Sequence, residues 1–85
     1  MEALLKADEQ LPDREAMVAF LARLREDHAR HGSEWENQTL DRFLAALTAW
    51  VEACPGWHAN FDQVLSPQGD WTLFARALSA ARVYE

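Results

Sequence analysis

Apolar residues recur at helical spacing in three stretches of the chain. In the first stretch they occupy positions i, i+3, i+4, i+7 and i+11, which form one helical face: Met17, Phe20, Leu21, Leu24 and His28. Asp13 follows Leu11-Pro12 and is a good N-cap, and Gly32 is typical of a helix end. We therefore predict a helix from near Asp13 to Gly32.

The second stretch predicts a helix that begins at Asn37 or Thr39, since both residues are acceptable N-caps. Its apolar positions again share one face: Leu40, Phe43, Leu44, Leu47, Trp50 and Val51. The sequence Cys54-Pro55-Gly56 follows. Because proline disfavours helical backbone in the residue before it and glycine comes next, we expect the helix to end there.

The third stretch predicts a helix that begins at Asp70, after the turn-rich residues 66–69, and runs to the last residue. Its apolar stripe consists of Trp71, Phe74, Leu78 and Ala81, widened by Leu73, Ala77 and Tyr84. We expect Arg76 and Arg82 on the solvent side of this helix. Arg82 is expected to pair with Glu36 or Glu52.

The pattern indicates an all-α fold, because strand-like alternation is absent at any useful length. We predict a small single-domain bundle of three main helices over residues 1–85, with its core in about residues 13–85. A further short helix is predicted around Ala3-Leu4-Leu5, and residues 57–65 are predicted to form one irregular helical turn beneath the bundle. We expect core positions for three of the tryptophans: Trp50, Trp57 and Trp71.

Net charge narrows the classes of function. The 85 residues include 8 Lys+Arg and 14 Asp+Glu, which give a formal net charge of −6. This excess of acid argues against nucleic acid and anionic membranes as partners, and is compatible with a basic protein partner. The single cysteine cannot form an internal disulfide, and the first residues lack the layout of a signal peptide. A cytoplasmic location is therefore expected.

Several sequence segments resemble a known family. They are Trp35-Glu36-Asn37 with Thr39-Leu40, Phe43-Leu44-x-Ala-Leu47-x-Ala49-Trp50, and Trp71 with the C-terminal Ala80-Ala81-Arg82-Val83-Tyr84-Glu85. Together they resemble a family of small bacterial proteins known only as a domain of unknown function, over residues 16–85. The resemblance implies an Ala-Arg-Val-Tyr-Glu type of C-terminus and no assigned activity or catalytic residue.

Acidic residues surround Trp35 where the first two predicted helices connect: Glu26, Asp27, Glu34 and Glu36. One interpretation is a partner-binding surface, because an exposed tryptophan with a carboxylate rim is typical of a hot spot for a basic partner. The alternative interpretation is that Trp35 packs over the bundle, Asn37 caps the second helix and the acidic residues solvate the loop.

A weaker hypothesis is a metal site. His28 and His31 are spaced i, i+3 near a helix end, and Cys54 and His58 flank the Pro-Gly turn. These four side chains are of the types that bind Zn²⁺ tetrahedrally, although their spacing matches no recognised finger. The alternative is three ordinary histidines and a cysteine that acts as a small buried hydrophobe.

Catalytic motifs are not evident. Cys54 and His58 lack a visible orienting carboxylate, and the isolated glycines form no phosphate-binding loop. We therefore expect no enzyme activity and no cofactor. The primary hypothesis is a non-enzymatic protein–protein interaction module, of which an immunity or antitoxin-like inhibitor is one version. The alternative is a small-molecule or zinc-binding domain, and a homodimer stays open in either case.

Overall fold

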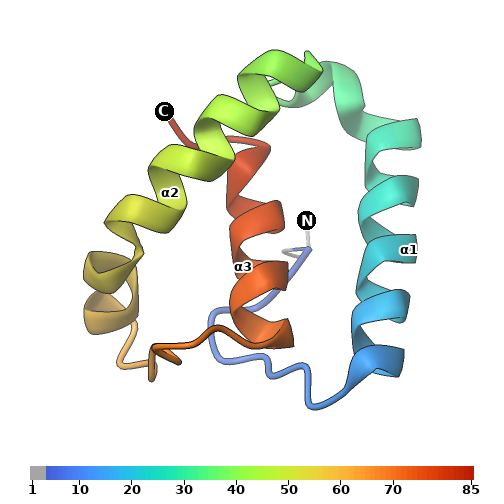
Figure 1. The fold of residues 1–85 in the computed structure, drawn as a ribbon. Helices are drawn as coiled ribbons and strands as arrows, with labels where there is room; N and C mark the ends of the chain where they lie inside the picture. The colour runs from blue at the N-terminus through green and yellow to red at the C-terminus, as the bar shows by residue number, and fades with distance from the viewer. Residues whose placement is uncertain (1–3) are drawn as a thin grey trace.

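The computed structural model describes residues 4–85 and contains three α-helices (Figure 1). They are α1 (Arg14–His31), α2 (Leu40–Asn60) and α3 (Trp71–Ala81), and a short 3₁₀ turn, η1 (Gly32–Glu34), follows α1. The predicted all-α bundle of three main helices is confirmed. The short helix predicted near the N-terminus is not formed at Leu4 and Leu5, which lie in a bend, and Ala3 lies outside the described residues.

Local capping explains where the helices begin. Each N-cap side chain accepts a hydrogen bond from the backbone N–H three residues later, at 2.8, 3.1 and 2.7 Å for Asp13, Thr39 and Asp70. Such bonds satisfy N–H groups that have no partner within the helix. The predicted starts at Asp13 and Asp70 are confirmed, and Thr39 is the cap of the second helix.

The predicted end of the second helix at Cys54-Pro55-Gly56 is wrong, because α2 continues to Asn60. Pro55 removes the N–H that would bond the carbonyl of Val51. Val51 lies on the exposed side of α2, where water can satisfy that carbonyl. On the opposite side, Trp50, Cys54 and His58 follow i, i+4 spacing and are all buried. Packing of this face outweighs the local proline and glycine signals, and residues 57–60 are regular helix.

Helix α3 lies between α1 and α2 in the fold (Figure 1). Within residues 4–85, α1 and α2 each pack on α3 and do not contact each other. One buried cluster joins α1 to α3 and consists of Leu11, Met17, Phe20 and Ala75. The other joins α2 to α3 and consists of Trp50, Cys54 and Ala77. Small residues on α3 allow both neighbours to approach closely.

Three expectations for the third helix are wrong. The helix ends at Ala81 and does not run to the last residue. Arg76 is only 5% exposed and Arg82 is partly buried, so neither lies on a solvent side. The N-terminal segment covers Arg76, whose Nη2 donates to the Ala7 carbonyl oxygen at 3.3 Å. Trp71, expected in the core, is 41% exposed because it stands at the first turn of α3.

No helix within residues 4–85 combines the length and the apolar character that a membrane crossing requires.

Candidate functional site

Asp27 connects the end of α1 to the C-terminal end of the chain. Its Oδ2 accepts a hydrogen bond from Trp35 Nε1–H at 2.8 Å and another from Arg82 Nη1–H at 3.0 Å. The side chains of Asp27 and Arg82 are 21% and 20% exposed, so this ion pair is partly shielded from water. The predicted partners of Arg82, Glu36 and Glu52, are therefore wrong. The aspartate on α1 is the partner.

Trp35 is buried and does not form an exposed hot spot. Its exposed fraction is 8%, its ring stacks on Phe43 with centroids 5.9 Å apart, and the ring of His28 contacts it edge-on at 5.1 Å. This is the alternative interpretation, in which the indole packs over the bundle. A partner-binding surface at this position cannot use the indole as its anchor.

Asn37 holds the C-terminal tail, residues 82–85, against the start of α2. Its Nδ2 donates to the carbonyl oxygens of Ala81 and Tyr84 at 3.0 and 2.8 Å, and its backbone N–H donates to the carbonyl oxygen of Arg82 at 3.0 Å. Asn37 is itself buried and does not cap the second helix, since Thr39 has that role. The Trp35-Glu36-Asn37 segment and the C-terminal residues of the resemblance therefore meet in space.

Three of the predicted partner-binding residues remain on the surface beside the connection between α1 and α2. Glu26 pairs with Arg30 at 3.0 Å, Glu34 pairs with His31 Nδ1 at 2.9 Å, and Glu36 is exposed. Exposed pairs of this kind contribute about 0–1 kcal/mol, so these carboxylates are available to another charged group at little cost. Asp27 and Trp35, in contrast, bond each other inside the fold.

The structure does not bring the four candidate metal ligands together. His28 contacts the Trp35 ring and His31 pairs with Glu34, while Cys54 and His58 lie on the buried face of α2. His58 Nδ1 donates to the Cys54 carbonyl oxygen at 2.7 Å. Burial raises the pKa of the Cys54 thiol above its usual value and so disfavours the metal-binding thiolate. Residues 4–85 contain no group of three or more His, Cys, Asp or Glu side chains that could hold a metal ion.

A partly exposed apolar face, which the sequence interpretation missed, lies between α1 and α2 over α3. On α3, Thr72 and Arg76 bond the N-terminal segment, and the intervening Phe74 lies on the opposite side. Phe74 lines a cavity of about 240 Å³ with Leu47 and Val51 of α2. We call this face the apolar groove and define it by these three cavity residues and their neighbours at helical spacing. The neighbours are Leu44 of α2 and Leu78 of α3, with Leu24 of α1, which packs on the same α1–α3 cluster as Leu78, and Leu21 one turn before Leu24.

The sequence pattern contained this signal in part. Leu21, Leu44 and Phe74 belong to the apolar stripes that predict the helices, and a stripe does not show whether another element covers it. The exposed fractions of these three side chains are 42%, 49% and 48%. The structure places α1 and α2 on separate sides of α3. Part of each apolar stripe is therefore not covered by any helix or loop of the described residues.

We expect the Asp27→Asn variant to lower the free energy of unfolding by about 2 kcal/mol at pH 7, because hydrogen bonds to a charged group are lost or weakened. Burial acts to raise the pKa of Asp27. The hydrogen bonds from Trp35 and Arg82 and the charges of Arg82 and His31 outweigh it, so the pKa lies below its usual value. A lowered pKa stabilises the fold above the unfolded-state value of about 3.9, and this stabilisation is lost as pH falls through the folded-state value.

Urea unfolding at pH 7 and at successively lower pH measures this effect. The difference between wild type and Asp27→Asn should narrow below about pH 4. Asp8→Asn, at an exposed position, is the control and should match wild type within about 0.5 kcal/mol. A difference that stays constant from pH 7 to pH 3 contradicts the role of the Asp27 carboxylate.

The fold and these contacts define a small three-helix protein whose C-terminal tail is held by an asparagine and an aspartate. The chain belongs to a family of unknown function, described as "Family of unknown function (DUF7660)", whose model matches residues 13–85. The resemblance to a family of unknown function is thereby confirmed. No curated protein and no solved structure matches the chain.

Proposed function

We propose that this protein is a non-enzymatic interaction module that binds one α-helix of a partner protein in the apolar groove. The observation that carries the proposal is the exposure of large apolar side chains on neighbouring helices. Leu44 and Val51 of α2 and Phe74 of α3 are 49%, 46% and 48% exposed. Exposed apolar residues that gather on one face are typical of protein interaction sites.

The arrangement of the helices supports a helix as the occupant. Packed helices lie about 8–10 Å apart, and a helix with its side chains is about 10–12 Å in diameter. Because α1 and α2 contact α3 and not each other, the space between them over α3 suits one more helix. A fourth helix would complete the arrangement of a four-helix bundle. Its apolar residues at i, i+3, i+4 and i+7 would contact the groove.

Charge supports a basic partner. The chain has a net charge of −6, and Glu26, Glu34 and Glu36 lie exposed at the connection between α1 and α2. Carboxylates at the edge of an interface raise the association rate of a basic partner more than they raise affinity. An inhibitor of the immunity or antitoxin type, acting in the bacterial cytoplasm, is one concrete version of this proposal.

Affinity capture with groove variants tests the proposal. Tagged wild type, Leu44→Gln and Phe74→Gln are used to capture proteins from a lysate of the source cells, with low-salt and high-salt washes. We expect wild type to retain one basic protein, and each groove variant to retain it more than tenfold less, because loss of a hot-spot side chain costs about 2 kcal/mol or more. Val64→Gln is the matched control, because Val64 is 88% exposed in the loop after α2.

Three results contradict the proposal. The first is the absence of any retained protein, and the second is a protein that the groove variants retain as well as wild type does. The third is self-association: a dimer in analytical ultracentrifugation that Leu44→Gln dissociates would show that a second copy of the chain, and not a partner helix, covers the groove.

A further inference from the structure

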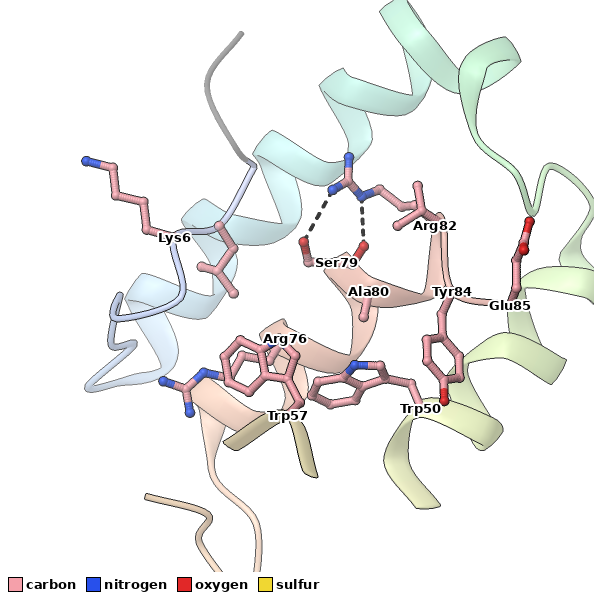
Figure 2. Close-up of a pocket in the computed structure, with 11 residues that line it drawn as sticks. Lys6, Trp50, Trp57, Arg76, Ser79, Ala80, Arg82, Tyr84 and Glu85 are labelled. Carbon is pink, nitrogen blue, oxygen red and sulfur yellow. Dashed lines mark hydrogen bonds between the residues drawn. The ribbon is translucent and has the colours of Figure 1, made fainter. Parts of the chain in front are cut away.

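We propose that this protein also binds a small aromatic carboxylate in a second cavity, on the side of α3 opposite the apolar groove. The cavity has a volume of about 490 Å³, which lies within the usual range for small-molecule sites. The N-terminal segment, α2, α3 and the C-terminal tail all contribute to its lining (Figure 2). This site is independent of the proposed partner surface, because the two lie on different sides of α3.

Aromatic rings line one side of this cavity. Figure 2 shows Tyr84, Trp50 and Trp57 in a row, with the guanidinium of Arg76 at the Trp57 end. The ring centroids of Trp50 and Trp57 are 5.9 Å apart, and the Arg76 guanidinium carbon lies 5.1 Å from the centroid of the Trp57 ring. A planar ring placed against these tryptophans would make the apolar and edge contacts that aromatic groups favour.

Arg76 is a buried cation that forms no ion pair with the described residues. It is 5% exposed, and no carboxylate within residues 4–85 lies within ion-pair distance of it. Its Nη2 donates only to neutral oxygens, the Ala7 carbonyl at 3.3 Å and Gln63 Oε1 at 3.1 Å. Its Nε is buried and has no hydrogen-bond partner. A buried charge in this state is costly, and a ligand anion beside the guanidinium would supply the missing opposite charge.

The charges around the cavity are unevenly distributed. Lys6 lies on the same side as the Arg76 guanidinium, and Glu85 lies at the opposite end (Figure 2). Arg82 also lines the cavity, but its Nη1 is engaged by Asp27 at 3.0 Å. Burial lowers the pKa of Arg76, and the charge of Asp70, which lies beyond ion-pair distance, offsets only part of this effect. The carboxylate of a ligand therefore belongs at the Arg76 end, where a guanidinium can form charge-assisted hydrogen bonds.

The tryptophans provide a site-specific test by NMR. The probe is indole-3-acetate, titrated into ¹⁵N-labelled protein while the four indole N–H signals are followed. We expect the Trp50 and Trp57 signals to shift and those of Trp35 and Trp71, which do not line the cavity, to stay in place. Indole-3-acetamide has the same ring without the charge, and should bind at least tenfold more weakly, because charge-assisted hydrogen bonds contribute about 1.5–3 kcal/mol.

Variants separate this site from unspecific binding. Arg76→Gln should weaken indole-3-acetate at least tenfold, and Arg30→Gln, at an exposed arginine of α1, should leave binding unchanged. Arg76 is buried, so the folding of its variant has to be checked. Ala80→Leu provides a second test, because Ala80 lines the cavity and a larger side chain there would fill it.

Three outcomes would overturn the proposal. The first is the absence of any shift of the Trp50 and Trp57 signals at about 10 mM probe, where even millimolar affinity would saturate. The second is equal affinity of the wild-type protein for indole-3-acetate and indole-3-acetamide, a comparison that does not depend on the folding of any variant. The third is unchanged binding by Ala80→Leu.

Discussion

Replacement of Trp35 by alanine is expected to lower the free energy of unfolding by about 3–5 kcal/mol, the usual cost of deleting a large buried aromatic side chain. Trp35 is 8% exposed and stacks on Phe43 of α2. The variant also removes the indole N–H that donates to Asp27 at 2.8 Å. Since folded domains have about 5–15 kcal/mol of stability in total, this variant should lose a large part of the stability of the fold.

Chemical denaturation followed by far-UV circular dichroism measures this effect. Glu36→Ala is the matched control at the next residue, because Glu36 is exposed and its removal should change stability by no more than about 0.5 kcal/mol. A loss below about 1 kcal/mol for Trp35→Ala would mean that the indole is not packed as the structure places it. In that case the exposed hot-spot interpretation of this residue would regain support.

Asn37→Ala is expected to lower the free energy of unfolding by about 2–4 kcal/mol. The variant deletes the two donors that satisfy the carbonyl oxygens of Ala81 and Tyr84. Each unsatisfied buried acceptor costs about 1–3 kcal/mol, and water that enters after release of the tail recovers part of this cost. We therefore expect local release of residues 82–85 to accompany the loss of stability.

Urea unfolding gives the change in stability, and amide hydrogen exchange at Val83 and Tyr84 reports release of the tail. Both amides bond the carbonyl oxygen of Ala80, at 3.0 and 2.9 Å, and should exchange faster in the variant. Gln38→Ala is the control for removal of a side-chain amide, because Gln38 is exposed and makes one bond, to the Ser33 carbonyl oxygen. Equal stability of the two variants would contradict the role of Asn37.

The residues of the family resemblance have structural roles in this protein. Trp35, Asn37 and Arg82 connect the start of α2 to the end of the chain through hydrogen bonds within the fold. Membership of the family therefore accounts for how the chain folds without identifying what it binds. The apolar groove uses mostly other residues. The cavity beside Arg76 shares much of its lining with the segments of the resemblance: Trp50, Ala80, Arg82, Val83, Tyr84 and Glu85.

The candidate site was predicted only in part. The sequence indicated that Asp27, Trp35 and neighbouring glutamates gather at the connection between the first two helices, and they do. It did not indicate that Arg82, 55 positions from Asp27, bonds the same carboxylate. The zinc hypothesis grouped residues by type and spacing, whereas the structure separates His28 and His31 from the buried face that holds Cys54 and His58.

What the sequence by itself determined is local. The 3.6-residue period of apolar positions predicted the three helices. The N-cap residues predicted where they begin, at Asp13, at Asn37 or Thr39, and at Asp70, because an N-cap bonds an N–H only three residues away. These interactions depend on neighbours along the chain. An N-cap hydrogen bond forms when the residues that follow the cap are helical, and it does not depend on the tertiary structure.

The tertiary structure alone decided which element covers each helical face. It extended α2 past Pro55 because Trp50, Cys54 and His58 pack on one side of it. It buried Arg76 because the N-terminal segment lies over that side of α3, and it left Phe74 exposed because α1 and α2 stay apart. Helical periodicity shows which face of a helix is apolar, but it does not show which element packs on that face. Burial depends on contacts between residues that are far apart in the chain.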